Sequence, residues 1–248
     1  MSTQVTINKM KEMRLLGMYR SYETMQQNPN ASPLTPDEVI SLLVEAEWMD
    51  RSNRRINRYL KSAKFRYQAT VEEVDYQAQR NLDKNQLLRL ADCSFIDRKE
   101  TIIITGPTGV GKSYLASALG HQACLQGYRV LYFNAGKLFA KLNQLKADAS
   151  LDKEMRRIAR HDLLILDDFG LKPLDQNARY ALLEIMEDRH HYQSTIFTSQ
   201  LPLNEWYEVI GDKTVADAIL DRIAHHAHRI ELKGESLRKK RPQKTKNS

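Results

Sequence analysis

The stretch TIIITGPTGVGKSYLASALG, residues 101–120, carries the side chains whose chemistry is easiest to name. It contains the pattern G-x-x-x-x-G-K-[ST] between a β-rich run and a helical one, fulfilled by Gly106, Gly111, Lys112 and Ser113. In such a loop, backbone N–H groups close around phosphate oxygens, the lysine reaches the β- and γ-phosphates, and the hydroxyl ligates Mg²⁺. A chance glycine-rich turn is the alternative. The predicted nucleotide-binding residues are Gly106, Pro107, Thr108, Gly109, Val110, Gly111, Lys112, Ser113 and Tyr114.

An acidic pair ends the apolar run LLILDDFG, residues 163–170. Beside a bound nucleotide, Asp167 and Ser113 would hold Mg²⁺, and Asp168 would orient or deprotonate the attacking water. The alternative is that Asp168 caps the following turn. A strand expected at 129–134 comes between the two motifs, so the strand at 163–168 is not simply the next one along from the phosphate loop.

The run STIFTSQLP, residues 194–202, ends in three polar residues, Thr198, Ser199 and Gln200. A polar side chain at this place could hydrogen-bond the γ-phosphate or the attacking water. An ordinary strand end before a turn explains the same residues equally well.

Arg222 lies near the end of an amphipathic helix expected at 214–226. An arginine there could stabilise charge on the nucleotide of a neighbouring subunit, an effect worth about 10³–10⁵ in rate where it operates. The alternative is a surface arginine paired with Asp217 or Asp221.

The segment RSNRRINRYLKSAKFRY, residues 51–67, holds seven basic residues and no acidic one. Basic side chains repeated along a helix suit the phosphates of duplex DNA and give affinity without sequence choice. A solvated charged face is the alternative, and the basic tail beyond residue 237 is weaker evidence of the same kind. The predicted DNA-binding residues are Arg51, Arg54, Arg55, Arg58, Lys61, Lys64 and Arg66.

Five short apolar runs alternate with helical patterns after residue 100 and predict a parallel sheet between helices, an α/β fold. We expect the strands at 101–105, 129–134, 163–168, 194–200 and 227–232. The first hundred residues are polar and helical, with one helix ending near Pro29, a second starting at the capping box of Thr35 and Glu38, and a third starting at Thr70 and Glu73. The expected division is 1–75, 76–233 and a basic tail at 234–248.

Composition limits the kind of protein. The chain of 248 residues has a formal net charge of +7, which leans towards a polyanionic partner. Its two cysteines lack metal or redox spacing, and no run approaches the ~20 apolar residues that cross a bilayer. We therefore expect a cytoplasmic protein with no membrane partner.

The motifs GPTGVGKS, LLILDDFG, TSQLP, AILDRI and HRIELKGESLRK together resemble the IstB-type helper ATPases of bacterial insertion-sequence transposition. The N-terminal stretches KMKEMRLLGMYRSYE and AEWMDRSNRRINRYLKSAKFR also look like that family, so the resemblance covers nearly the whole chain. These proteins belong to the AAA+ superfamily, close to the helicase loader DnaC and the initiator DnaA. The resemblance implies an AAA+ P-loop NTPase core, a five-stranded parallel sheet between helices, behind an N-terminal all-α domain.

The resemblance further implies a function and roles for residues. The family's proteins are ATP-dependent oligomers that bind and deform duplex target DNA and recruit or stimulate the cognate transposase, with ATP and Mg²⁺ as cofactors. By position, Asp167 and Asp168 are the acidic pair, with Asp168 as its catalytic member, Gln200 is the first sensor, Arg222 the arginine finger and Arg238 a candidate second sensor. Hydrolysis of ATP would reset the assembly.

Two other functions compete with this one. A DnaC-like replicative helicase loader shares the ATPase core, so the core does not separate it from a transposition helper. The basic face at 51–61 favours duplex DNA, because a helix that docks on a protein is expected to expose a larger apolar stripe. A small-molecule kinase needs an acceptor pocket and a mobile basic lid, and neither pattern follows the phosphate loop.

Overall fold

The structure is a computed structural model that describes residues 3–27, 34–76, 80–147, 150–225 and 227–237. It divides into two compact units, Met1–Arg58 and Tyr59–Ser248, which are described separately. Residues 59–75 belong to the second unit because Ala69, Val71 and Val74 are buried in its core. The boundary between the compact units, after Arg58, thus lies earlier in the chain than the expected domain boundary at 75/76. The expected domain division stays a prediction.

The first unit is helical and contains α1 (Thr3–Glu12), α2 (Leu16–Gln27) and most of α3 (Pro36–Ala63). The expectation of one continuous helix up to Pro29 was wrong. The helix breaks at Arg14, whose φ of 58° is left-handed, and the Leu15 N–H bonds back to the Met10 carbonyl at 2.8 Å. This is a helix C-terminus of the Schellman type.

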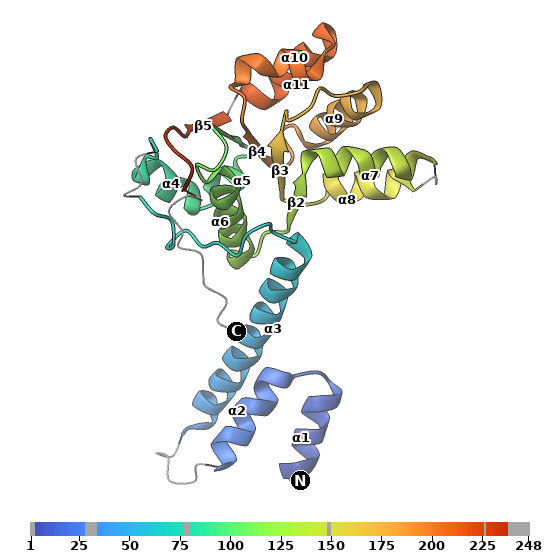
Figure 1. Ribbon diagram of the computed structural model, residues 1–248. Coiled ribbons are helices and arrows are strands. Elements are labelled where there is room, and N and C mark those ends of the chain that lie inside the picture. Colours follow the sequence, from blue (N-terminus) through green and yellow to red (C-terminus); the bar gives the residue numbers. More distant parts are fainter. Residues whose placement is uncertain (1–2, 28–33, 77–79, 148–149, 226, 238–248) are drawn as a thin grey trace, which may run out of the picture. The chain divides into compact units, whose positions relative to one another are not determined.

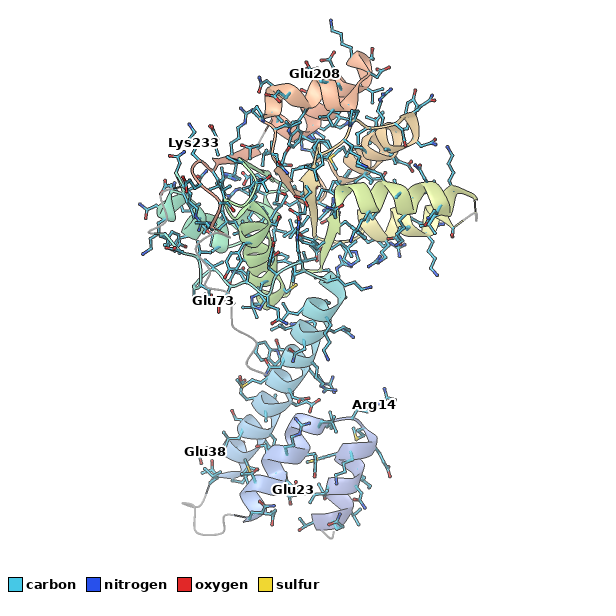
Figure 2. All side chains as sticks on the ribbon, in the orientation of Figure 1. Arg14, Glu23, Glu38, Glu73, Glu208 and Lys233 are labelled. Carbon is cyan, nitrogen blue, oxygen red and sulfur yellow. The ribbon has the colours of Figure 1, made fainter. Side chains whose placement is uncertain are left out.

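The predicted capping box at the start of α3 is confirmed. The Thr35 N–H donates to Glu38 Oε2 at 2.7 Å, and the Glu38 N–H donates to Thr35 Oγ1 at 3.3 Å. Figure 2 labels Glu38 at this helix start. Two otherwise unpaired N–H groups are satisfied in this way, which fixes where α3 begins.

The second unit is built on a five-stranded parallel sheet in the order β2-β3-β4-β1-β5 (Figure 1). All five predicted strands are confirmed, and β4 separates β3 from β1, as the spacing of the motifs indicated. The strands are β1 (Thr101–Thr105), β2 (Val130–Asn134), β3 (Leu163–Phe169), β4 (Ser194–Ser199) and β5 (Ala227–Glu231).

Helices cover both faces of this sheet (Figure 1). Ile102 and Ile104 of β1 face a core shared with α4 and α6, whereas Ile103 faces a core shared with α7, α8, α9, α10 and α11. Both faces are buried, which explains the continuous apolar strand sequences. The helices are α4 (Lys84–Ala91), α5 (Ser94–Asp97), α6 (Lys112–Leu125), α7 (Ala135–Ala147), α8 (Leu151–Ala159), α9 (Gln176–Arg189), α10 (Trp206–Ile210) and α11 (Lys213–Ala224), with a 3₁₀ turn at Leu203–Glu205.

The helix expected to start at Thr70 and Glu73 is absent from the described residues 64–76. Residues 71–74 instead form a single turn, in which the Val74 N–H donates to the Val71 carbonyl at 3.3 Å, and both valines are buried in the core. The next helix is α4, which Asp83 caps by accepting from the Asn85 N–H at 2.8 Å. Across the described ranges, no helix is both long and apolar enough to span a membrane.

Candidate nucleotide-binding site

Three motifs meet at the carboxyl ends of β1, β3 and β4. The phosphate loop follows β1, the acidic pair ends β3, and the polar triplet ends β4, which pairs in parallel with both β1 and β3. They surround a pocket of about 360 Å³, whose lining includes Lys112, Ser113, Asp168 and Gln200. This placement agrees with the rule that open parallel sheets bind ligands at their carboxyl edge.

The phosphate loop is folded around its own lysine. Lys112 starts α6, and its buried Nζ donates to the carbonyls of Gly106 at 2.7 Å and Pro107 at 2.8 Å. Val110 is fully buried, so it can serve a nucleotide through its backbone alone. Lys112 also lines the pocket at the N-terminus of α6, where both its charge and the helix dipole attract phosphate.

Asp167 is the most enclosed acid of the site, with no exposed surface. Its carboxylate accepts from Ser113 Oγ at 2.7 Å, from Arg66 Nη1 at 3.0 Å, and from the hydroxyls of Thr198 and Tyr132. Burial opposes ionisation of Asp167, but the hydrogen bonds from Thr198, Tyr132 and Ser113 outweigh it and hold its pKa below the usual value. The group is a carboxylate at neutral pH.

Asp168 faces the pocket from a left-handed backbone with a φ of 57°. Its Oδ2 accepts from Arg66 Nη1 at 2.7 Å and from Asn134 Nδ2 at 3.1 Å. Together with Ser113 Oγ and Asp167, it supplies hydroxyl and carboxylate oxygens, the donor types that Mg²⁺ takes. These residues therefore fit a magnesium ion beside bound phosphates.

The three polar residues that end β4 have different surroundings. Thr198 is buried, donates to Asp167 and accepts from the Asp168 N–H at 3.0 Å, while Ser199 donates to the Phe169 carbonyl at 2.8 Å. Gln200 is exposed to the pocket, where its Oε1 accepts from Thr108 Oγ1 at 2.7 Å. Gln200 is thus the member of the triplet placed to meet a nucleotide, and its sensor role stays a prediction.

Arg222 does not line this pocket. It lies on α11, where its Nη2 is 3.2 Å from Glu187 Oε1 and its Nη1 donates to the Ala218 carbonyl at 2.7 Å. Its ion-pair partner is on α9, and Asp217, one of the two acids expected, instead accepts from the Tyr207 hydroxyl at 2.8 Å. Arg222 thus lies away from the nucleotide pocket of its own chain, and its role as an arginine finger stays a prediction.

Arg80 is a pocket residue that the sequence did not reveal. Its side chain is 3% exposed, its Nη1 donates to the Val110 carbonyl at 3.1 Å, and its Nη2 donates to the Asp75 carbonyl at 2.7 Å. Burial lowers the pKa of its guanidinium, and Nε has no hydrogen-bond partner among the described residues. A lone arginine in a polar stretch carries no local signal of this position.

The segment after β5 covers the phosphate loop. The Leu232 N–H donates to the Thr105 carbonyl at 2.8 Å, and the Leu237 N–H donates to the Gly109 carbonyl at 3.0 Å. A Cβ on Gly109 would lie 2.1 Å from Ser236 Oγ, so only glycine permits this approach. Figure 2 labels Lys233 in this segment. Arg238, the candidate second sensor, lies outside the described residues.

The seven predicted DNA-binding residues have different surroundings. In the first unit, Arg51 Nε lies 2.6 Å from Glu47 Oε1 and Arg54 Nε lies 2.7 Å from Asp50 Oδ2, while Arg55 and Arg58 are exposed. In the second unit, Lys61 and Lys64 are exposed.

Arg66 lies beyond the helix that carries the arginines at 51–58, because α3 ends at Ala63 and Lys64 has a left-handed φ of 55°, and its DNA-binding role stays a prediction. The helical spacing therefore does not continue to Arg66. Its guanidinium instead contacts Asp167 and Asp168.

Solved structures share the fold of about two thirds of the chain. DnaI matches with a TM-score of 0.57 at 23% identity over 68% of this chain and 90% of that chain. The DnaC helicase loader matches with a TM-score of 0.56 at 21% identity over 68% of this chain and 99% of that one. The α/β fold is therefore that of AAA+ P-loop NTPases, as expected.

Whole-chain comparisons identify the family. An insertion sequence ATP-binding protein of Sinorhizobium fredii is 45% identical over 97% of this chain and 98% of its own length. One from Pseudomonas aeruginosa is 33% identical over 91% of this chain and 87% of its own. The family described as IstB-like ATP binding protein matches residues 8–245. With its phosphate loop and acidic pair assembled around one pocket, the chain belongs to the family of IstB-like ATP-binding proteins of insertion sequences.

Proposed function

We propose that the protein is an ATP-hydrolysing helper of transposition. It assembles as an oligomer on duplex target DNA, deforms that DNA and recruits or stimulates the cognate transposase. The observation that carries this proposal is the placement of Arg222: the pocket is lined by the phosphate loop and Asp168, whereas Arg222 is not part of its lining. If Arg222 acts on a nucleotide, it would do so from a second subunit.

In the proposed reaction, Lys112 and the backbone of the phosphate loop hold the β- and γ-phosphates, while Ser113 and Asp167 hold Mg²⁺. The ion would balance charge on the phosphates. Asp168 faces the same pocket as a partly exposed carboxylate and would orient or deprotonate water. Gln200, at the end of the neighbouring strand, would hydrogen-bond the γ-phosphate or that water.

Coupling to assembly follows if Arg222 completes a neighbour's site. ATP then favours the interface between subunits, because the guanidinium gains a triphosphate to stabilise. Hydrolysis removes that gain and weakens the interface, which resets the assembly. We place these events in the cytoplasm, where ATP and the target DNA are both present.

A test of action in trans uses two inactive variants. Lys112→Ala is expected to lack nucleotide binding but to keep Arg222, and Arg222→Ala keeps the pocket but loses the arginine. Mixing the two should restore ATP hydrolysis at mixed interfaces. As a control, mixing Arg222→Ala with the double variant Lys112→Ala/Arg222→Ala should stay inactive. Equal, unrestored rates in both mixtures would contradict the proposal.

The duplex-binding part rests on the exposed arginines of α3 in the first unit. Arg55 is exposed, and among the described residues no acid forms a salt bridge with it. Arg51 and Arg54 also contact solvent but share their charge with Glu47 and Asp50. We therefore assign a larger share of phosphate contact to Arg55 than to either of these two.

One observation keeps the helicase-loader alternative open. α3 exposes an apolar stripe at four-residue spacing, with Ile40 at 60%, Val44 at 52% and Trp48 at 65% exposed. A stripe of this kind suits docking on another protein, which is the transposase for a helper and the helicase for a loader. Binding to duplex DNA distinguishes the two functions, because only the transposition helper requires multimers bound to duplex DNA.

A further inference from the structure

Residues 65–67 follow α3 closely and lie against the nucleotide site of the second unit. A Cβ on Gly120 of α6 would lie 2.6 Å from the ring of Phe65, and that ring meets Tyr132 edge-on with centroids 6.2 Å apart. Tyr67 packs against Tyr114, also at 6.2 Å. The aromatic residues on either side of Arg66 therefore fix its backbone beside the pocket.

Between these two anchors, one guanidinium nitrogen bridges the acidic pair. Arg66 Nη1 lies 3.0 Å from Asp167 Oδ2 and 2.7 Å from Asp168 Oδ2. Burial opposes the charge on Arg66, but the charge-assisted hydrogen bonds to Asp167 and Asp168 outweigh it and raise its pKa. Its side chain is 40% exposed, so solvent can reach the guanidinium and the bridge can open without unfolding the core.

The bridged oxygens belong to the residues that fit Mg²⁺. Asp167 accepts from Ser113 through Oδ1 and from Arg66 through Oδ2, so hydroxyl, carboxylate and guanidinium meet at one point. A divalent ion and a guanidinium compete for the same carboxylates, because each neutralises the charge that attracts the other.

We propose that Arg66 is an internal cation that stabilises the acidic pair and that Mg²⁺ entering with a nucleotide displaces it from Asp167 and Asp168. Arg66 thereby sets how strongly nucleotide binding depends on Mg²⁺. This inference rests on the magnesium site of the proposed function but not on DNA, transposase or oligomer.

Two opposite effects follow for a variant without this charge. In the absence of Mg²⁺, the two carboxylates face the phosphates uncompensated, so nucleotide affinity falls. In the presence of Mg²⁺, the ion no longer has to displace a guanidinium, so affinity stays equal or rises. The ratio of the two dissociation constants isolates Arg66 from any general loss of stability, because misfolding lowers both affinities together.

The experiment is equilibrium binding of a fluorescent, non-hydrolysable ATP analogue to the full chain, once with excess Mg²⁺ and once with EDTA. Arg66→Gln should raise the ratio of Kd in EDTA to Kd in Mg²⁺ by about tenfold over the wild type, which corresponds to about 1.4 kcal/mol. Arg66→Lys keeps the charge and should give a ratio near that of the wild type. If Arg66→Gln does not fold, the lysine variant still allows the same measurement.

The matched control is Arg157→Gln. Arg157 is 41% exposed and pairs with Glu154 at 2.9 Å, away from the pocket lining. Its ratio should equal that of the wild type. A ratio in Arg66→Gln no different from this control, while the wild type still depends on Mg²⁺, would overturn the inference alone. Nucleotide binding that ignores Mg²⁺ in the wild type would instead contradict the magnesium site of the proposed function.

Discussion

The nucleotide site and the basic segment of α3 balance their charges in different ways. In the site, Arg66 meets Asp167 across 101 residues of sequence, and Ser113 meets Asp167 across 54. On α3, Arg51 pairs with Glu47 and Arg54 pairs with Asp50, each four residues apart on the same helix. The first cluster forms only when the sheet is folded, whereas the two pairs on α3 join residues four apart and can form within the helix itself.

This difference separates residues that do chemistry from residues that supply affinity. A cluster assembled by the sheet holds each group in one geometry, so the loss of one group disturbs the function of the others. Arginines along a helix act more independently, so each contributes a small part of the free energy of DNA binding. Changes in the site should therefore give large, all-or-none effects, and changes on α3 should give graded ones.

The largest effect is expected from Asp168→Asn. The amide keeps the size of the side chain but cannot take a proton from water, so the rate of ATP hydrolysis should fall about 10²–10⁴-fold. Nucleotide affinity should change little, since Lys112 and the phosphate loop are intact. Single-turnover hydrolysis together with equilibrium binding measures both quantities. A hydrolysis rate within a few-fold of the wild-type rate would contradict the catalytic role and indicate that Asp168 only caps the turn.

Lys112→Ala should come next, with nucleotide affinity reduced by about 100-fold, as the removal of charged hydrogen bonds of about 1.5–3 kcal/mol implies. Nucleotide-dependent assembly should disappear with it. Lys172→Ala is the control, because Lys172 is exposed and does not line the pocket. Titration of a fluorescent nucleotide gives the affinities. Normal assembly of the Lys112 variant in ATP would contradict the proposed switch.

A smaller, graded effect is expected on α3. Arg55→Gln should weaken duplex binding several-fold and flatten the dependence of log K on log salt by about 0.9 for each phosphate that is no longer neutralised. The matched variant Arg54→Gln should cost less, because Arg54 also pairs with Asp50. Anisotropy titrations at several salt concentrations compare the two. Equal weakening in both variants would refute the division between paired and exposed arginines.

The last effect concerns the stability of the first unit rather than its binding of DNA. Buried Glu47 accepts from the Gly17 N–H at 2.8 Å and from Arg51 Nε at 2.6 Å. Burial raises its pKa, but the bonds from Arg51 and the backbone lower it overall, below 4.5. Its contribution is therefore complete above pH 4.5 and is lost as the pH falls through the lowered pKa.

Glu47→Gln should cost about 1–3 kcal/mol at neutral pH and less in acid. Urea unfolding followed by Trp48 fluorescence, in a Trp206→Phe background, measures this unit because Trp48 is its only tryptophan. A destabilisation that is equal at pH 7 and at pH 3 would show that Glu47 does not act as a carboxylate.

Local patterns predicted the parts of the fold that local chemistry determines. The phosphate loop, the acidic pair, the five strands and the capping box of α3 each follow from a short pattern with one physical meaning. The contacts of Arg66 with the acidic pair could not be predicted from helical spacing, because Arg66 lies beyond the end of α3 at Ala63. The capping-box pattern of Thr70 and Glu73 does not start a helix; the chain makes a single turn there, closed by the Val74 N–H and the Val71 carbonyl.

Other features depend on tertiary contacts that no local pattern encodes. Arg80 reaches the phosphate loop only through the fold, 30 residues before Val110 in the sequence. The segment from Leu232 to Leu237 closes on Gly109 because β5 lies beside β1. These positions become visible only when the sheet order is known.

The central proposal is that ATP controls assembly of the protein on duplex DNA. The mass of the particles formed tests this control most directly. The protein would be measured on linear duplexes of several lengths with ATP, with ADP and without nucleotide. Defined multimers are expected to form on duplex DNA with ATP, to grow with duplex length and to dissociate in ADP. Failure to bind duplex DNA in every nucleotide state would contradict this control and favour a loader that acts through the apolar stripe of α3.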